Sequence, residues 1–210
     1  MNTTVYLIRH GEVEYRLNEK GERMMYGPEA HLSQFGIEQI RRLGKTLSCE
    51  PNKITVLYSS PFTRAQETAK ILAEILKVKV LTDERLKDVY TPGQEKMTMA
   101  EAIEKIRAKV NPVMKREDEL PVRMKGFFDE VLNKERGKTV GIVSHGDPIR
   151  VLVDMLFYPG KTLLSTARDE LYLGKGEAWK LVFNENCQLL EKKLIFDESD
   201  FGQLWGRKIY

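Results

Sequence analysis

The sequence predicts an α/β protein: a three-layer α/β/α sandwich with a mostly parallel sheet, helices on both faces and a small helical cap insertion. Two observations lead to this fold class. Short runs of β-branched and aromatic residues alternate with segments of helical period, which is the order expected of a parallel sheet. Polar and reactive residues directly follow several of those runs, where open α/β sheets bind ligands. The 210 residues suit one domain, residues 1–210, with a cap at 92–122.

Four apolar runs are expected to form strands, at residues 4–8, 54–58, 78–81 and 139–143. Residues 10–32 between the first strand and the first helix are polar and glycine-containing, so they predict a long functional loop. Ser33 is a suitable N-cap for the helix that follows this loop. Pro61 suits the start of the next helix.

Two further segments of helical period lie between residues 92 and 136, where they interrupt the strand–helix alternation. The first, MTMAEAIEKIRAKV, is expected to cap the site. The second, EDELPVRMKGFFDEVLNKERG, is expected to cross over to the strand at 139–143. Beyond residue 168, the runs ELYLG, WKLVF and CQLLEKKLIF predict antiparallel or edge strands.

The composition narrows the class of partner. Lys and Arg number 34 and Asp and Glu number 31, a net charge of +3, so no nucleic-acid partner is expected. No apolar run approaches the length of a membrane span, and the first residues lack a secretory pattern, so we expect a cytoplasmic protein without a membrane partner. Cys49 and Cys187 form no metal-spaced pair. A homodimer is compatible with the sequence.

Two of the three histidines stand at matching positions, each after a strand and before a glycine. The first strand ends in Arg9-His10-Gly11 and the fourth in Ser144-His145-Gly146, while Arg64 lies one turn into the helix after the second strand. Arginine binds phosphate oxygens through its planar fork, and a neutral imidazole is a competent nucleophile. Glycine allows the backbone to approach a ligand closely. Together these residues predict a phosphate pocket with a nucleophilic histidine.

Four stretches, LIRHGE, HLSQFGIEQ, YSSPFTRAQETA and IVSHGDPIR, occur in this order and closely resemble the histidine phosphatase superfamily, also called the phosphoglycerate mutase-like family. The resemblance covers about residues 4–155. It implies that His10 attacks phosphorus and becomes phosphohistidine. It also implies that Arg9, Arg64 and His145 hold the phosphoryl oxygens, with Gly11 and Gly146 beside the phosphate and Gly27 as a backbone contact of the pocket.

The family commonly places a catalytic glutamate shortly after the third strand, and in this chain Asp88 falls at that position with a shorter side chain. Asp88 is therefore the expected general acid, and Glu84 and Glu95 are weaker alternatives. Many mutases of the family carry Trp-Asn where this chain has Tyr15-Arg16. Arg16 is either an added cation of the phosphate pocket or a solvated loop residue.

The leading functional hypothesis is a phosphomonoester hydrolase that acts on a small phosphorylated metabolite through phosphohistidine. One alternative is a phosphoglycerate mutase that depends on 2,3-bisphosphoglycerate. A second is a catalytically silent module that binds phosphorylated ligands or proteins on the same fold. No metal or other cofactor is expected, except 2,3-bisphosphoglycerate if the protein is a mutase, because the arginines supply the positive charge.

Overall fold

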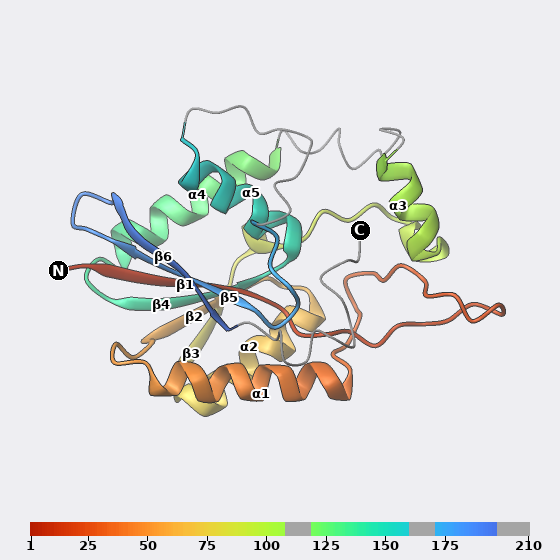
Figure 1. Cartoon of the computed structure of the whole chain (residues 1–210), viewed down its shortest axis with the longest axis horizontal. Coiled ribbons are helices and arrows are strands. Elements are labelled where there is room, and N and C mark those ends of the chain that lie inside the picture. Colours follow the sequence, from red (N-terminus) through yellow and green to blue (C-terminus); the bar gives the residue numbers. More distant parts are fainter. Residues whose placement is uncertain (108–118, 160–170, 197–210) are drawn as a thin grey trace.

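A computed structural model describes residues 1–107, 119–159 and 171–196 of the chain, and its centre is a six-stranded sheet (Figure 1). The strand order across the sheet is β3-β2-β4-β1-β5-β6. The strands are β1 (Thr3–Arg9), β2 (Val56–Ser59), β3 (Lys79–Thr82), β4 (Thr139–Ser144), β5 (Ala178–Phe183) and β6 (Leu189–Phe196). The predicted α/β fold class is confirmed, and the four expected strands all form, with ends that shift by one or two residues.

The sheet is mixed because its two halves run differently. Strand β4 pairs in parallel with both β1 and β2, and β2 pairs in parallel with β3. Strand β5 is antiparallel to β1, and β6 is antiparallel to β5 at the edge. The runs WKLVF and CQLLEKKLIF therefore add antiparallel strands as expected. The run ELYLG does not: its residues 171–174 lie outside any strand.

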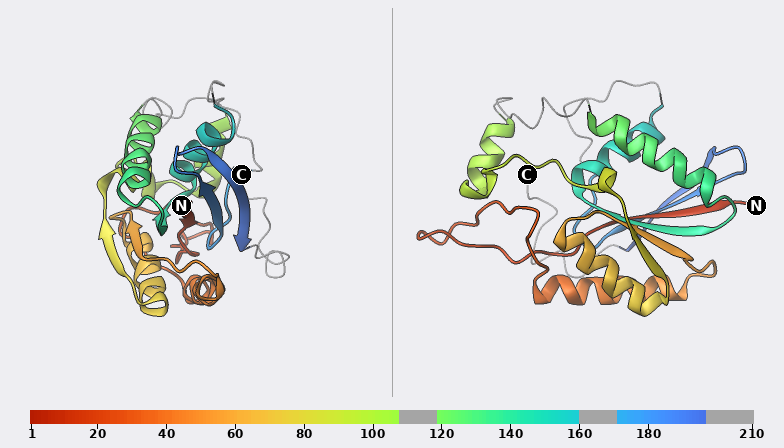
Figure 2. Two further views of the ribbon diagram at one scale, coloured as in Figure 1. Left: turned by 90° about the vertical axis from the view of Figure 1, so that its left-hand side faces the viewer. Right: turned by 180° about the vertical axis from the view of Figure 1, so that it is seen from behind.

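Helices cover both faces of the sheet, which Figure 2 shows along and across the strands. Helices α1 (Gln34–Cys49) and α2 (Thr63–Leu76) pack on one face, and α4 (Glu119–Lys134) and α5 (Gly146–Phe157) pack on the other. Strand β1 serves both cores because successive side chains point to opposite faces. Val5 and Leu7 join the core under α4 and α5, while Tyr6 and Ile8 join the core under α1 and α2.

Local capping explains the start of α1. The Ser33 side chain accepts a hydrogen bond from the Gly36 backbone N–H at 3.0 Å, so it caps α1 as the sequence predicts. Helix α2 begins at Thr63 rather than at Pro61, with Phe62 as its N-cap residue. The prediction for Pro61 was wrong by two residues, because Pro61 and Phe62 form the bend between β2 and the helix.

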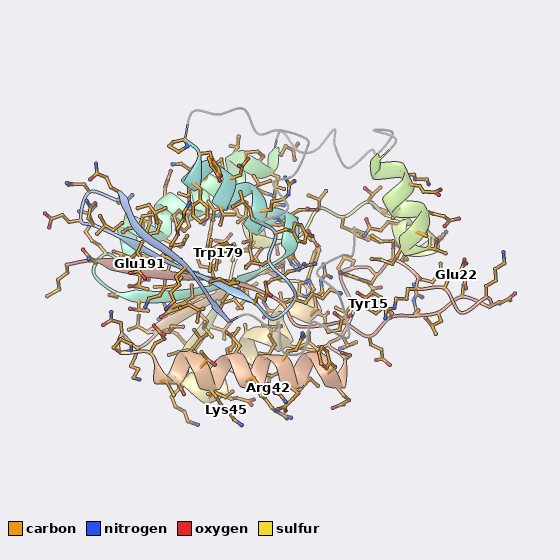
Figure 3. All side chains as sticks on the ribbon, viewed as in Figure 1. Tyr15, Glu22, Arg42, Lys45, Trp179 and Glu191 are labelled. Carbon is orange, nitrogen blue, oxygen red and sulfur yellow. The ribbon has the colours of Figure 1, made fainter. Side chains whose placement is uncertain are left out.

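The long loop and the segment after β3 lie together beyond the ends of the parallel strands (Figure 1). Two short 3-10 helices, η1 (Glu84–Leu86) and η2 (Gln94–Lys96), precede α3 (Met99–Arg107). The loop pairs with this segment through an isolated bridge between Met24 and Thr98. In Figure 3, Tyr15 lies on the inner part of the loop and Glu22 near its tip.

The expected cap at residues 92–122 thus includes η2 and α3, but its last residues belong to another element. Helix α4 begins at Glu119, so residues 119–122 are part of the crossover helix that leads to β4. Residues 108–118 lie outside the described part of the chain. Within that part, no helix is both long enough and apolar enough to cross a bilayer.

Candidate active site

The site residues meet because three parallel strands end side by side. Arg9 at the end of β1 is paired with Ser144 at the end of β4, and Ser59 at the end of β2 is paired with Val143. The pairing continues beyond the strands, since the His10 N–H donates to the Ser144 carbonyl at 3.1 Å. The residue after each strand therefore points into the same space at the carboxyl edge of the sheet.

His10 is buried, with 1% of its surface exposed, and two neighbours fix its tautomer. The Nε–H of Arg64 donates to Nε2 of His10 at 3.1 Å, so Nε2 carries a lone pair. The other ring nitrogen, Nδ1, lies 2.8 Å from the carbonyl oxygen of Gly11, which can only accept. Nδ1 therefore carries the proton. Burial and the nearby Arg64 guanidinium lower the pKa of His10, so the ring is neutral at physiological pH.

Arg64 connects three parts of the site through the three nitrogens of its guanidinium. Besides the bond to His10, Nη1 donates to the Gly27 carbonyl at 3.1 Å and Nη2 to the Asp88 carboxylate at 3.1 Å. The contact with Gly27 agrees with the expected backbone contact of the loop. Arg64 is 2% exposed, so its charge is available only to groups inside the site. A planar fork held in this way can turn to a phosphoryl group without leaving the pocket.

His145 lies beside His10, with 5.2 Å between the ring centroids. Its Nε2 is 2.7 Å from the hydroxyl oxygen of Ser60, and its Nδ1 is 3.6 Å from a carboxylate oxygen of Asp88. Burial lowers the pKa of His145, and Arg64 and Arg9 lower it further. The site therefore contains two neutral imidazoles.

Arg9 is the second guanidinium of the site and is 8% exposed. Its Nη1 donates to the Leu173 carbonyl at 2.6 Å. Its guanidinium carbon lies 4.7 Å from the centroid of the Tyr172 ring. These contacts hold the guanidinium at the end of β1, where its charge, like that of Arg64, contributes to the lowered pKa values of His10 and His145.

Asp88 follows η1 and is the only one of the three candidate acids that contacts the histidines or arginines of the site in the described chain. Burial raises the pKa of Asp88 to about 6, against the opposing effect of Arg64, and Asp147 raises it further. Glu84 pairs instead with Lys87 on the surface, and Glu95 accepts a hydrogen bond from Tyr90. A carboxyl group that titrates near neutral pH is suited to both proton donation and proton acceptance.

The two glycines after the histidines are required by close packing. A Cβ at Gly11 would lie 2.8 Å from the Gly36 carbonyl oxygen in α1, and a Cβ at Gly146 would collide with the Tyr172 hydroxyl. Because Gly11 has no side chain, α1 can pack against the site, and because Gly146 has none, the Tyr172 ring can do the same. Gly146 is also the first residue of α5, so its N–H lies at the positive end of that helix.

Arg16 is placed apart from this group. It is exposed on the loop, and its Nη2 lies 3.5 Å from the Glu95 carbonyl. No hydrogen bond or ion pair joins it to His10, Arg64 or Asp88 in the three described ranges. Its role in phosphate binding stays a prediction.

The sequence predictions missed the segment 171–177, which forms a further wall of the site. Tyr172 and Leu173 contact Arg9, and the Gly176 N–H donates to the His10 carbonyl at 3.0 Å. The Lys175 ammonium lies 3.2 Å from the Glu12 carboxylate. The segment precedes β5, which was expected only as an added strand of unspecified position. Because β5 pairs with β1, the segment before β5 lies next to Arg9 at the end of β1. In the sequence, the run Gly174-Lys175-Gly176 is the one signal that could have pointed to this segment.

The arrangement can bind a dianion and attack it. Two buried guanidinium groups lie near a neutral imidazole that has one nitrogen free of hydrogen, and a carboxyl group of raised pKa contacts one of these guanidinium groups. Within the described ranges, no three His, Cys, Asp or Glu side chains are grouped so that they could hold a metal ion.

Comparisons with known proteins agree with this geometry. The family model of the histidine phosphatase superfamily (branch 1) matches residues 5–169. Phosphoglycerate mutase-like protein 4 of Arabidopsis thaliana is 26% identical, with 94% of this chain and 91% of that protein covered. Phosphoserine phosphatase 1 of Hydrogenobacter thermophilus is 29% identical, with 70% and 72% covered.

Among solved structures, a variant of phosphoserine phosphatase from Entamoeba histolytica in complex with phosphoserine shares the fold. It superposes with a TM-score of 0.68 at 21% identity, over 94% of this chain and 97% of that chain. The family match spans the ends of β1, β2 and β4 that carry the site, and it ends before β5 and β6. The chain belongs to the histidine phosphatase superfamily.

Proposed function

We propose that the protein is a phosphomonoester hydrolase that acts on a small phosphorylated metabolite through a phosphohistidine at His10. One observation carries the proposal: the Nε2 lone pair of His10 is fixed by the Gly11 carbonyl on the far side of the ring and faces the Arg64 guanidinium. Membership of a superfamily whose relatives are named as phosphatases or mutases supports an enzyme.

In the first step, Nε2 of His10 forms a bond to phosphorus as the bond from phosphorus to the ester oxygen breaks. The hydrogen bond that the Arg64 Nε–H donates to Nε2 is replaced by one to a phosphoryl oxygen, and Arg64 keeps its proton. Arg9 and His145 hold the other phosphoryl oxygens and stabilise the charge of the transition state. Asp88 in its protonated form donates a proton to the leaving oxygen, and the alcohol departs.

In the second step, water attacks the phosphorus of phosphohistidine and the phosphorus–nitrogen bond breaks. Asp88, now a carboxylate, takes the proton from the attacking water and is ready for the next cycle. Inorganic phosphate leaves, and Nε2 regains its lone pair. The proposal requires no metal and no organic cofactor, because guanidinium groups supply the positive charge that phosphoryl transfer needs.

The test is to trap the intermediate and compare two histidine variants. The wild-type protein is mixed with p-nitrophenyl phosphate, quenched, and analysed by mass spectrometry for an acid-labile phosphate on the peptide that contains His10. His10→Ala should give no phosphopeptide and no hydrolysis. His31→Ala should keep both, because His31 lies on the surface against Glu67. Full activity in His10→Ala would overturn the proposal.

A phosphoglycerate mutase is the second candidate, since the match with a protein named phosphoglycerate mutase-like covers 94% of this chain. Incubation with 3-phosphoglycerate, with and without 2,3-bisphosphoglycerate, separates the two. Release of phosphate without isomerisation supports the hydrolase, and isomerisation that requires the bisphosphate supports the mutase. A folded protein that shows neither activity and forms no phosphohistidine would be a silent ligand-binding module.

A further inference from the structure

A half-buried lysine that the proposed mechanism does not use, Lys175, lies beside the active site. Lys175 precedes β5, and its side chain is 12% exposed. Its ammonium lies 3.2 Å from the Glu12 carboxylate and donates a hydrogen bond to the Tyr15 hydroxyl. It also lies 4.6 Å from the centroid of the Tyr15 ring and 5.5 Å from that of Tyr26. We call Lys175, Tyr15 and Tyr26 the Lys175 wall.

The Lys175 wall is continuous with the phosphate-binding arginines. The guanidinium carbon of Arg64 lies 4.9 Å from the centroid of the same Tyr26 ring that Lys175 contacts. From the other side, Gly176 donates its N–H to the carbonyl of His10, so the residue after Lys175 is attached to the nucleophile. The Lys175 charge is also near enough to contribute to the lowered pKa of His10, so a substrate attached to a phosphate at His10 has this wall among its neighbours.

The wall offers positive charge to such a substrate. The π faces of its two rings are already in contact with cations, since Arg23 and Lys175 contact Tyr15, and Arg64 and Lys175 contact Tyr26. Burial raises the pKa of Tyr15, so its hydroxyl is neutral. A cationic substrate group is therefore disfavoured at the wall, and an anionic group is favoured.

Glu12 is the one carboxylate that pairs with Lys175 in the described chain, and it is 25% exposed. Separating an ion pair costs little free energy when its carboxylate is partly exposed, because water then solvates the carboxylate. An ammonium has three donors, and the hydrogen bond to Tyr15 and the ion pair with Glu12 use two of them. Lys175 can therefore exchange a protein carboxylate for an anionic group of a ligand.

We propose that Lys175 is a specificity-determining residue that binds a second anionic group of the substrate, so that the enzyme prefers phosphomonoesters that carry a carboxylate or a second phosphate. This inference rests on the proposed function and names the substrate class of the same site. It assigns the preference to the segment before β5, whose residues Tyr172 and Leu173 contact Arg9.

Lys180 on β5 provides a matched control. It pairs with Glu50 at 2.7 Å, the Tyr6 hydroxyl donates to the same carboxylate, and the Lys180 side chain is 16% exposed. The two lysines thus share a Lys–Glu–Tyr arrangement and a similar burial, but only Lys175 adjoins the site. Lys175→Met and Lys180→Met each remove one charge and keep the length of the side chain.

The decisive measurement compares kcat/KM for glycerol phosphate, 3-phosphoglycerate and propanediol bisphosphate, which differ in the second group. In Lys175→Met, kcat/KM for the two substrates with a second anion should fall about 10- to 100-fold through KM, the range of a charged hydrogen bond. For glycerol phosphate it should change less than about threefold. Comparing the losses in kcat/KM for 3-phosphoglycerate and propanediol bisphosphate shows whether the wall prefers a carboxylate or a second phosphate. Lys180→Met should match the wild type on all three substrates.

Glu12→Gln gives an effect of opposite sign. Without the competing carboxylate, Lys175 is free for the substrate, so KM for 3-phosphoglycerate should fall while KM for glycerol phosphate stays the same. Equal losses on all three substrates in Lys175→Met would show a general structural role and overturn the inference. So would a wild-type enzyme that does not distinguish glycerol phosphate from 3-phosphoglycerate.

Failure of the proposed function is distinguishable from failure of this inference. If the wild type hydrolyses none of these esters, calorimetric binding of 3-phosphoglycerate and glycerol phosphate to the His10→Ala protein tests the wall directly. Tighter binding of 3-phosphoglycerate that is lost when Lys175→Met is added supports the inference. Equal binding of the two ligands overturns it.

Discussion

The Nε–H of Arg64 donates a hydrogen bond to Nε2 of His10 over 3.1 Å, while Nη2 of the same guanidinium donates to Asp88 over 3.1 Å. One side chain thus contacts both the proposed nucleophile and the proposed acid. It keeps the lone pair of His10 on Nε2 and prevents protonation of the ring. These contacts lead to three predictions about the chemistry and the stability of the site, and the close packing of Gly146 against Tyr172 leads to a fourth.

Replacing Arg64 by lysine should show that the shape of the guanidinium matters as well as its charge. A single ammonium cannot contact His10, Gly27 and Asp88 together, so kcat for p-nitrophenyl phosphate should fall on the order of 10²- to 10³-fold. Arg42→Lys is the control, since Arg42 lies on the exposed face of α1 and pairs with Glu38. An Arg64→Lys enzyme with wild-type kcat would contradict the role assigned to the fork.

The rate for alkyl phosphates should fall as pH rises through about 6. The pKa of Asp88 is raised to about 6, so the proton that the leaving alkoxide needs is lost above that pH. Asp88→Asn should be slow with glycerol phosphate and should lack this alkaline decline. The first step with p-nitrophenyl phosphate, measured as the initial burst of nitrophenolate, should be slowed less, because nitrophenolate leaves without a proton.

Full pH profiles of kcat for both enzymes and both substrates provide the measurement. Ionisation of the substrate itself is common to the two proteins, so only the difference between their profiles reports on Asp88. If Asp88→Asn keeps the wild-type alkaline decline, another group supplies the proton.

Asp88→Asn should also stabilise the fold at neutral pH. A carboxyl whose folded pKa is raised binds its proton more tightly in the folded state, so folding is favoured at low pH and that contribution is lost as pH rises from about 4 to about 6. Above pH 6 the variant should be more stable by about 1–2 kcal/mol, after allowance for partial exposure of the side chain. At pH 4 the difference should vanish.

Urea unfolding at pH 4 and pH 8 measures this difference. The buried histidines have the opposite dependence: their lowered pKa values cost stability as pH falls below about 6.5. Because His10 and His145 are present in both proteins, their effect cancels in the comparison. A variant less stable than the wild type at pH 8 would show that the Arg64–Asp88 pair outweighs the desolvation of Asp88.

Gly146→Ala should damage both stability and catalysis. The added methyl group collides with the Tyr172 hydroxyl, so the ring must move away from Arg9. We expect a loss of about 1–3 kcal/mol in the free energy of unfolding and a lower kcat. Gly126→Ala in α4 is the matched control: nothing lies within 4 Å of its Cβ, and alanine should stabilise that helix by roughly 0.5–1 kcal/mol.

Thermal unfolding and steady-state kinetics of both glycine variants check this prediction. Adding Tyr172→Ala to Gly146→Ala removes the collision, so the double variant should be more stable than the sum of the single changes implies. Strict additivity would mean that the two residues do not compete for space.

The sequence by itself determined the parts of this protein that depend on local pattern. Alternating apolar runs and helical segments gave the parallel strands, and short motifs after the strand ends identified Arg9, His10, Arg64, His145 and Asp88, which the structure brings together. These inferences succeed because parallel strands in one sheet must end at the same edge. The family followed from the same motifs, and the match over residues 5–169 confirms it.

Only the tertiary structure decided which distant segments complete the site. The sequence of β5 does not specify its position in the sheet. In the structure β5 pairs with β1, and this pairing places Tyr172 next to Arg9 and Lys175 next to Glu12. Likewise, Arg16 follows the motif closely in sequence yet lies outward against Glu95. The physical reason is that strand order and loop direction are set by long-range packing of the two cores, which local residue patterns do not encode.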